Sequence, residues 1–532
     1  MGRKKKTPKP APAHSSEAAG SPWKLAVFAG LLTFLLYLPS LWSGFVYDAE
    51  AQIQADNYIH DRSHFVEVLT LRVMSRDVLD NNRPVQLLSL MTDSLFWGRN
   101  PLGYHLTNNL LHSVNVALVF LLIVMALRDA GAWKREPGYL GAAFLGALLF
   151  GFHPINVEPV AEVSSREDVL VAFFTLIGLF CATRFGREGK WWAFAAAVAA
   201  CFLAVGTKES GVVAPVIIAC YWLLFRRGDD WRRWLLLVAT SLLLAGLFIA
   251  ARFALQPPDS MVFVHPPPRL GGSFVATLEI QPRIWAFLLS SVFWPLHLSA
   301  DYGPQNLAWL GEIKAAFILL AFLLVQGLLS WKSRLAALGA LIFWLGLGPA
   351  SNLLPMYRPI ADRYMYLPTL GLALTMAGGL SLLAARRHWY RPAQIIGTML
   401  LLGLGIQTWQ RESVFANSLN LWKDTLWKSP FSSTAANNFG YALFRHGEYT
   451  NALKAFDACL RLRDGQKADS WCGAALVYEK LGDKLKAEDA LNQAIGLDSS
   501  YAHPDRLLKS MQSTPEDAAV ISQILARLPA QP

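Results

Sequence analysis

The sequence predicts an all-α protein in which a polytopic membrane domain is followed by an α-solenoid of helical repeats. Of the 532 residues, 54% are hydrophobic and 19 are tryptophan. The mean hydropathy of +0.32 is too high for an ordinary soluble domain. Apolar segments of helical length recur from residue 23 to about residue 409. Beyond that point the chain becomes polar, and a helical pattern repeats after 35 residues.

Three regions follow from this pattern. Residues 1–22 form a basic, Pro- and Ala-rich tail that we expect to be disordered and not a cleaved signal. Residues 23–410 form the membrane domain, and residues 411–532 form a soluble module of ordinary domain size. The net charge of +10 is the basic excess of a membrane protein and does not indicate a nucleic-acid partner. The five cysteines do not form a disulfide framework, although Cys459 and Cys472 could pair in an oxidising compartment.

Basic loops orient the membrane domain, because Lys and Arg gather on the cytoplasmic side of a membrane. The N-terminal RKKK and the loops RDAGAWKREPG, TRFGREGK, RRGDDWRR, WKSR and ARRHWYR are predicted to lie inside. This arrangement requires that the short segment Trp285–Leu298, with Pro295 and His297, does not cross or re-enters on one side. We therefore expect about eleven transmembrane helices, with the loop at Asp48 and the soluble module both outside.

The soluble module contains a repeat of the tetratricopeptide kind. Equivalent positions lie 35 residues apart, close to the period of about 34 in such repeats. The matching pairs are Gly447 and Gly482, Ala452 and Ala487, Ala455 and Ala490, and Leu460 and Ile495. Since two units are few for a solenoid, helices around Trp422 and after Pro504 are expected to cap the stack. Generic helical hairpins are the alternative. The concave surface of such repeats suits an extended peptide.

Two acids lie just beyond the first apolar helix, which runs roughly from Trp23 to Trp42. The helix ends in GFVYDAEAQI, so Asp48 and Glu50 lie within a few residues of the bilayer surface. A functional role is the default hypothesis for an acid so close to lipid, and a solvated loop acid is the alternative. The expected use is a base that acts on a substrate presented at the membrane.

The predicted outside loops collect further polar groups on one side of the membrane. They are Arg83, His105, Asn108, His153, Glu158, Arg166, Glu167, Asp168, Lys208, Glu209, Asp301, Arg358, Asp362 and Arg363. Snorkelling at span ends explains any single basic residue, but not the one-sidedness of the set. One acid with several cations suits a negatively charged leaving group, because a well-placed donor stabilises a transition state by roughly 3–4 kcal/mol. The membrane location implies a lipid-linked reactant.

A series of motifs resembles a known family. YDAEAQI, NRPVQLLSL, GYHLTNNLLH, FHPINVEPVAEVSSREDVL, GTKESGV, SADYGP and ADRYMYLP occur in that order, followed by the repeats. The series is similar to the transmembrane and tetratricopeptide-repeat family of C-type glycosyltransferases, over nearly the whole chain after residue 23. Animal members of that family are protein O-mannosyltransferases that use dolichyl-phosphate mannose. The chain has no Asn-x-Ser/Thr sequon and few repeats, which is compatible with a bacterial homologue.

The resemblance implies the C-type glycosyltransferase fold and an inverting transfer. A polyprenyl-phosphate sugar would be the donor, and a Ser or Thr hydroxyl of a protein docked on the repeats would be the acceptor. Asp48 is expected to act as base. Some of Arg83, Arg166, Lys208, Arg358 and Arg363 would hold the phosphate. Further substrate contacts are expected from His105, Asn108, His153, Glu158, Glu209, Asp301 and Asp362.

The chain departs from the family pattern at Ala49, where the usual motif reads Tyr-Asp-Asp. Either Glu50 replaces the second acid, or the second acid is dispensable, or Ala49 inactivates this chain. No metal is required if the cations neutralise the phosphate. Asp48 with Glu50, or His153 with Glu158, could nevertheless hold Mg²⁺ or Mn²⁺.

Two alternatives from other classes stay open: a lipid-linked-sugar transporter or flippase, and a non-catalytic scaffold built on the repeats. For a bacterial homologue the location would be the inner membrane, with the site and repeats on the periplasmic side. In a eukaryote it would be the endoplasmic reticulum membrane, with lumenal repeats.

Overall fold

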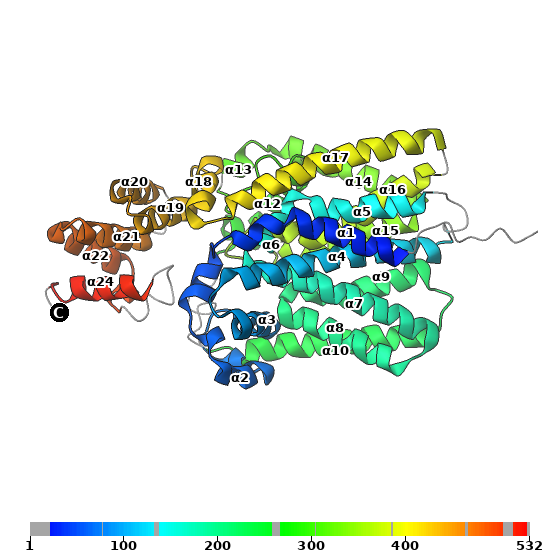
Figure 1. The fold of residues 1–532 in the computed structure, drawn as a ribbon, viewed down its shortest axis with the longest axis horizontal. Coiled ribbons are helices and arrows are strands. Elements are labelled where there is room, and N and C mark those ends of the chain that lie inside the picture. The colour runs from blue at the N-terminus through cyan, green and yellow to red at the C-terminus, as the bar shows by residue number, and fades with distance from the viewer. Residues whose placement is uncertain are drawn as a thin grey trace, which may run out of the picture.

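The computed structural model describes residues 22–76, 78–131, 138–257, 267–303, 305–384, 387–462, 467–503 and 514–528. The predicted N-terminal tail lies outside the described residues, apart from Pro22 at the start of α1. Within the described ranges every regular element is a helix, so the all-α prediction is confirmed. An elongated helical bundle continues into a smaller helical module at one end (Figure 1).

The long helices of the bundle lie side by side along its axis (Figure 1). They are α1 (Pro22–Leu36), α4 (Pro101–Asp129), α5 (Tyr139–Phe152), α7 (Arg166–Glu188), α8 (Trp191–Thr207), α9 (Val213–Phe225), α10 (Trp231–Leu255), α12 (Phe274–Phe293), α14 (Glu312–Lys332), α15 (Arg334–Leu347), α16 (Tyr366–Ala384) and α17 (Arg387–Val414). The remaining helices of this region are α3 (Pro84–Trp97) and the short helices α2 (Phe65–Leu69), α6 (Val157–Ala161) and α13 (Gln305–Ala308).

Several of these helices can cross a membrane. Five are long and apolar enough: Pro101–Asp129, Val163–Glu188, Trp231–Leu255, Glu312–Lys332 and Asp362–Ala384. A sixth span arises if Tyr139–Phe152 and Pro154–Ala161, which are bent by 48°, form one crossing, and four further apolar helices are shorter. The chain is therefore an integral membrane protein. The count of eleven crossings stays a prediction, because it also requires the four shorter helices to cross, together with α17, which does not meet the criterion.

Glycines allow α15 and α16 to pack closely against each other. A Cβ on Gly339 would lie 2.4 Å from the Gly371 carbonyl oxygen, and a Cβ on Gly371 would lie 2.5 Å from that of Gly339. Small residues of this kind let membrane helices approach closely. Buried polar contacts add to the packing, since the Tyr366 hydroxyl of α16 lies 2.7 Å from His112 Nδ1 of α4.

The repeat prediction is confirmed. Two helical hairpins follow each other, α19 (Ser433–Arg445) with α20 (Tyr449–Leu460) and α21 (Lys467–Lys480) with α22 (Lys484–Leu497). Gly447 and Gly482 occupy the two turns with φ of 77° and 81°, a backbone region that favours glycine. The four predicted alanines are buried between the paired helices. Helices α18 (Ser418–Lys428) and α24 (Pro515–Leu525) flank the hairpins. Cys472 is not in a disulfide, so its suggested pairing with Cys459 is not formed.

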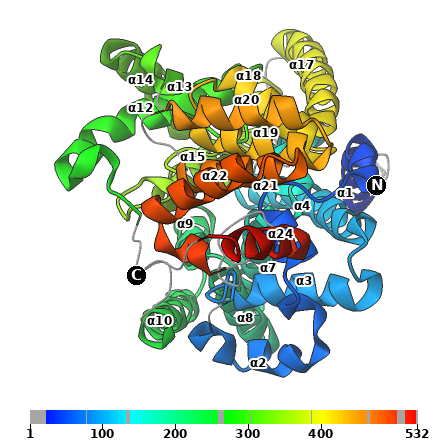
Figure 2. The same ribbon diagram turned by 90° about the vertical axis from the view of Figure 1, so that its left-hand side faces the viewer.

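The border between the two regions differs from the predicted boundary at residue 410. Helix α17 continues to Val414 without a break. Leu421 and Trp422 of α18 are fully buried and belong to the same apolar core as the bundle helices. The start of the repeat module is therefore packed into the end of the membrane domain. Figure 2 looks onto this end, with α19 to α24 lying across the bundle.

The arrangement generates a prediction about topology. Cysteines introduced at Ser63, in an exposed loop after Asp48, and at Leu485, 80% exposed on α22, should react alike with a membrane-impermeant maleimide in sealed cells. A cysteine at Lys190, in the turn between α7 and α8, should react only after permeabilisation. Protection of position 485 together with reactivity of position 63 would contradict the eleven-crossing arrangement.

Candidate functional site

The chain reaches Asp48 through an unusual backbone conformation. After α1, a short 3-10 helix (Leu38–Trp42) and an extended stretch lead to Tyr47, whose φ is +60°. This left-handed conformation is costly for an aromatic residue and persists only where the surroundings hold it. The Tyr47 ring is buried and stacks on Trp422 of α18, with ring centroids 5.2 Å apart. The conformation of Tyr47 thus sets the position of the next residue, Asp48.

Asp48 has the properties of a general base. Its side chain is 56% exposed, so a substrate can reach it. The surrounding protein nevertheless removes enough solvation to raise the pKa of Asp48 to about 6. The Arg363 guanidinium opposes this rise in pKa, whereas the carboxylates of Asp80, Glu167 and Glu158 add to it. Asp48 is therefore mostly ionised at neutral pH and is a stronger base than an ordinary aspartate.

Arg358 provides a positive charge that the protein leaves largely unneutralised. The Nη2 atom of Arg358 lies 4.0 Å from Asp48 Oδ1. The guanidinium carbon lies over the Tyr47 ring, 4.2 Å from the ring centroid. The other nitrogen, Nη1, is buried and has no hydrogen-bond partner within the described residues. Burial, followed by repulsion from Arg363, lowers the pKa of Arg358 to about 9. An anion placed here would satisfy a buried donor and offset an uncompensated charge.

Arg363 and Lys208 lie in the same cluster but already have carboxylate partners. Arg363 donates from Nη1 and from its backbone to the two oxygens of Glu158, at 2.7 and 3.2 Å. Lys208 Nζ lies 2.7 and 2.6 Å from the two oxygens of Asp168 and 3.6 Å from Glu167. Both cations can contribute to the field at Asp48, but their charges are balanced by nearby acids.

Arg83 forms the edge of this cluster. Its Nη1 donates to Asp80 at 3.2 Å and to Glu167 at 3.4 Å, and its Nε lies 3.6 Å from Glu209. Glu209 in turn accepts from Arg252 at 3.0 Å. The structure thus brings Asp48, Arg83, Glu158, Lys208, Glu209, Arg358 and Arg363 together in one network of charges.

Arg166 lies elsewhere, which corrects its predicted role as a phosphate ligand. Its side chain is fully buried, and all three guanidinium nitrogens are engaged. Nε donates to Asn108 at 2.5 Å, Nη1 to Ser89 at 2.9 Å, and Nη2 to the Tyr104 carbonyl at 3.0 Å, with Asp93 2.5 Å from Nη2. Arg166 therefore links α3, α4 and α7, and each of its guanidinium nitrogens already has a partner within the protein.

The predicted substrate contacts of three buried polar residues are also taken up by the protein. Asn108 accepts from Arg166 and donates to the Val160 carbonyl at 3.0 Å. His105 Nε2 lies 3.3 Å from the Gly44 carbonyl oxygen, and His153 Nε2 lies 2.9 Å from that of Val292. These residues support the framework around the site.

Glu50 and Asp301 point toward the repeat module. Glu50 accepts from Ser418 at 2.6 Å and pairs with Arg445 at 3.2 Å. Asp301 accepts from Ser432 at 2.6 Å. Both carboxylate oxygens of Glu50 are engaged by Ser418 and Arg445 at the interface between the bundle and the repeat module. Glu50 therefore does not take the place of a second acid beside Asp48.

Asp362 also lies at the interface between the bundle and the repeat module. It accepts from the Tyr302 hydroxyl at 2.6 Å and lies 3.6 Å from Arg411. Arg411 also donates to Asp424 of α18 at 3.1 Å, and Asp424 accepts from Lys428 at 2.8 Å. Asp362 thus helps to fix α18 and makes no contact with Asp48.

Glu162 is an acid near Asp48 that the sequence interpretation passed over. One carboxylate oxygen of Glu162 accepts from the Ser164 backbone and hydroxyl at 3.2 and 2.5 Å. Burial and then the charge of Asp48 raise the pKa of Glu162. The available signal was the Glu-x-Ser-Ser pattern before Arg166, in which the acid caps the following turn. By contrast, Ala49 is fully buried in an apolar cluster with Phe45.

The suggested metal ligands, Asp48 with Glu50 and His153 with Glu158, do not belong to a larger group of such side chains in the described part of the chain, and metal dependence stays a prediction. Within the described residues no group of three or more His, Cys, Asp or Glu side chains could hold a metal ion. Glu50 is turned to Arg445, and Glu158 is turned to Arg363.

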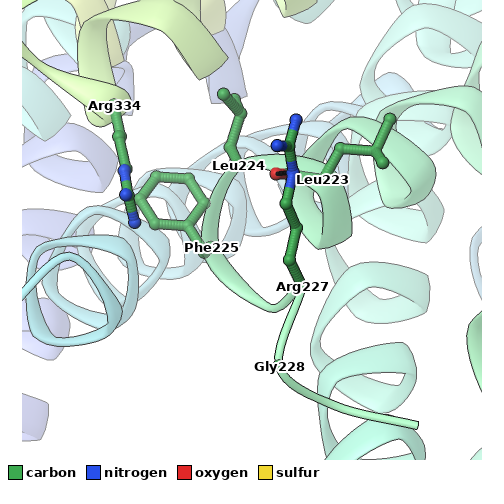
Figure 3. Close-up of a pocket in the computed structure, with 6 residues that line it drawn as sticks. All are labelled: Leu223, Leu224, Phe225, Arg227, Gly228 and Arg334. Atoms are coloured by element: carbon green, nitrogen blue, oxygen red, sulfur yellow. Dashed lines mark hydrogen bonds between the residues drawn. The ribbon is translucent and has the colours of Figure 1, made fainter. Parts of the chain in front are cut away.

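Two cavities lie away from Asp48. The first, about 320 Å³, is lined by the last residues of α9, by Arg227 and Gly228 just after it, and by Arg334 at the start of α15 (Figure 3). It belongs to the loops predicted to lie inside. The second, about 390 Å³, lies between the turn at Leu270 and the loop that contains Tyr357 and Pro359. These last two residues flank Arg358, so this cavity adjoins the loop of the candidate site.

Comparisons with known proteins show which families and relatives this chain resembles. Residues 164–259 match the family model described as dolichyl-phosphate-mannose-protein mannosyltransferase, and residues 468–501 match a tetratricopeptide repeat. A protein O-mannosyl-transferase of Caenorhabditis elegans, F38B6.6, is 24% identical over 80% of this chain and 61% of its own length. Human protein O-mannosyl-transferase TMTC3 is 23% identical over 81% of this chain and 50% of its own length.

A shorter match has higher identity: Xenopus laevis protein O-mannosyl-transferase tmtc2 is 31% identical over 37% of this chain and 23% of its own length. The chain thus spans about half to three fifths of the length of the Caenorhabditis elegans and human relatives. Among solved structures, ArnT from Cupriavidus metallidurans bound to undecaprenyl phosphate has a TM-score of 0.40 and 14% identity, over 89% of this chain and 80% of that one.

The two arginines make a testable contrast. Arg166→Ala would leave the buried Asp93 carboxylate unpaired, which costs about 3–5 kcal/mol. It should lower the thermal unfolding midpoint in detergent by several degrees. Arg358→Ala removes a charge without a close carboxylate partner and should change the midpoint much less. Equal destabilisation by both substitutions would contradict the assignment of Arg358 to ligand binding.

Proposed function

We propose that the protein is a membrane glycosyltransferase. It moves a mannose-like hexose from a polyprenyl-phosphate donor to a Ser or Thr hydroxyl of a protein acceptor, with inversion. One observation supports this most strongly: Asp48, an accessible base, lies beside Arg358, a cation with a buried and unsatisfied nitrogen. The match of residues 164–259 to a mannosyltransferase family and the names of the relatives point to the same chemistry.

The reaction is a single displacement at the anomeric carbon. Asp48 accepts the proton of the acceptor hydroxyl as its oxygen forms the new bond to that carbon. The bond between the carbon and the phosphate oxygen breaks, and polyprenyl phosphate leaves with the electron pair. Arg358 donates to the departing phosphate, and the fields of Arg363 and Lys208 add to its stabilisation. This proposal routes no step through a metal ion, and a requirement for Mg²⁺ or Mn²⁺ would be an addition to it.

The reaction does not need the second acid that the family motif has at position 49. Position 49 is fully buried among apolar side chains, so a carboxylate there would have to be desolvated. Glu50 is engaged with Ser418 and Arg445. Asp48 alone therefore serves as base, with Glu162 held as a neutral neighbour.

The donor enters from the lipid, and the acceptor docks on the repeats. The repeat helices lie at the same end of the bundle as the Asp48 loop (Figure 1). Docking there raises the effective concentration of acceptor hydroxyls near Asp48. The site and the repeats are assigned to the non-cytoplasmic face, which is the periplasm for a bacterial protein.

Replacement of the base tests the proposal. Asp48→Asn should reduce transfer from an undecaprenyl-phosphate sugar to a peptide by about 10²–10⁴-fold, the usual contribution of a general base. Asp61→Asn, the same change in an exposed part of the same loop, should leave the rate unchanged. The measurement is release of undecaprenyl phosphate together with mass of the glycosylated peptide. Full activity of Asp48→Asn would refute its role, and no release by the unaltered chain would favour the scaffold or transporter.

The pH dependence gives a second test. Because burial raises the pKa of Asp48 to about 6 and the ionised form is the base, the rate should fall as pH decreases through about 6. An ordinary aspartate would lose activity only near pH 4. The residual rate of Asp48→Asn should not fall as the pH decreases through about 6. If it does fall there, the pH dependence comes from the titration of another group.

A further inference from the structure

The conformation of the catalytic loop depends on contacts outside the loop. Tyr47 has a φ of +60°, a backbone conformation that is unfavourable for an aromatic residue and persists only where neighbours hold it. Within the loop itself only a short turn follows, in which Ala49 and Glu50 donate to the carbonyls of Val46 and Tyr47 at 3.2 and 3.3 Å. The side chain of Tyr47 must therefore be fixed from elsewhere.

Trp422 is the largest side chain that meets Tyr47. The two rings are stacked, with centroids 5.2 Å apart and planes at 25°. Trp422 is fully buried, and its Nε1 has no hydrogen-bond partner among the described residues. What Trp422 contributes is therefore the face of its ring. Arg358 lies over the same Tyr47 ring, so one aromatic side chain contacts both Trp422 and the proposed phosphate ligand.

Helix α18, which includes Trp422, makes hydrogen bonds to the bundle at both of its ends. At its start, the Ser418 hydroxyl donates to Glu50 at 2.6 Å. At its end, Lys428 Nζ donates to the Leu298 carbonyl at 3.0 Å. These contacts prevent α18 from moving without a change in the loop next to Asp48.

The same helix leads directly into the repeats. Ser432 caps α19 by accepting from the Ala435 backbone at 2.9 Å, and its hydroxyl donates to Asp301 at 2.6 Å. Arg445, at the end of α19, pairs with Glu50. The first repeat hairpin and the loop that contains Asp48 therefore share one set of contacts.

We propose that Trp422 is a positioning residue of the active site: its ring holds Tyr47 and thereby places Asp48 and Arg358. The repeat module then has a second role besides docking the acceptor, because its first helix completes the catalytic geometry. The role in catalysis rests on the proposed glycosyltransferase function, whereas the effect on loop geometry does not.

Conservative substitutions separate positioning from simple packing. Trp422→Phe keeps an aromatic face, whereas Trp422→Leu keeps apolar bulk without one. Trp427→Ala, at a 75% exposed tryptophan of the same helix, is the matched control. We expect Trp422→Leu to lower kcat about 100-fold with the peptide KM unchanged, since a displacement of about 1 Å can cost that much. Trp422→Phe and Trp427→Ala should stay within a few-fold of the unaltered chain.

A second measurement does not depend on activity. In an Asp48→Cys chain, the rate of maleimide modification at position 48, resolved by peptide mass spectrometry, should change several-fold on adding Trp422→Leu. It should not change on adding Trp422→Phe or Trp427→Ala. If the Trp422→Leu protein does not fold well enough to be purified, the labelling rates of Tyr47→Leu and Tyr47→Phe can be compared instead, because Tyr47 is the other ring of the contact.

Three outcomes would overturn the proposal. Equal kcat in the Leu and Phe variants would show that the ring face is not needed. A rise in the peptide KM of Trp422→Leu with unchanged kcat would show that the repeat module acts only in docking the acceptor. If the unaltered chain transfers no sugar, the proposed function fails, and equal labelling rates at position 48 in the Leu and Phe variants would then also refute the positioning role.

Discussion

The stack of Tyr47 on Trp422 is the contact on which the geometry of the site depends. It holds a backbone conformation that an aromatic residue rarely adopts, and Asp48 is the next residue along the chain. The same ring contacts Arg358, which comes from a loop more than 300 residues away in sequence. Three distant parts of the chain therefore meet at one side chain: the first loop, the loop before α16 and the start of the repeats.

The balance of charge around Asp48 explains why an anion fits there. Arg363 and Lys208 are each held by a carboxylate within 2.7 Å. Arg358 is not held in this way, because its only acidic neighbour among the described residues is Asp48, at 4.0 Å. A phosphate would satisfy Arg358 without breaking an existing ion pair. The other cations then act as a fixed field, which needs no rearrangement when charge develops.

Sequence patterns predicted the elements and the end of the bundle at which the polar groups gather, but not the direction of each side chain. Glycines and alanines at a constant spacing were enough for the repeats, and the motif YDAEAQI was enough to single out Asp48, whereas Arg358 was only one of five candidate phosphate ligands. Arg166 and Glu167 show the limit. Neighbours on a helix diverge by about 100°, so Arg166 enters the packing between α3, α4 and α7 while Glu167 reaches Arg83. Glu50 likewise turned to α18 and α19, which no local pattern in the loop could reveal.

The central claim is that Arg358 binds the phosphate of a polyprenyl carrier. Its most direct test is the dissociation constant for undecaprenyl phosphate, measured in detergent for the unaltered chain, Arg358→Gln and Lys208→Gln. A charge-assisted hydrogen bond contributes about 1.5–3 kcal/mol, so Arg358→Gln should weaken binding by at least about tenfold. Lys208→Gln should have a smaller effect, because Asp168 already neutralises that charge. Unchanged affinity in Arg358→Gln would contradict the account.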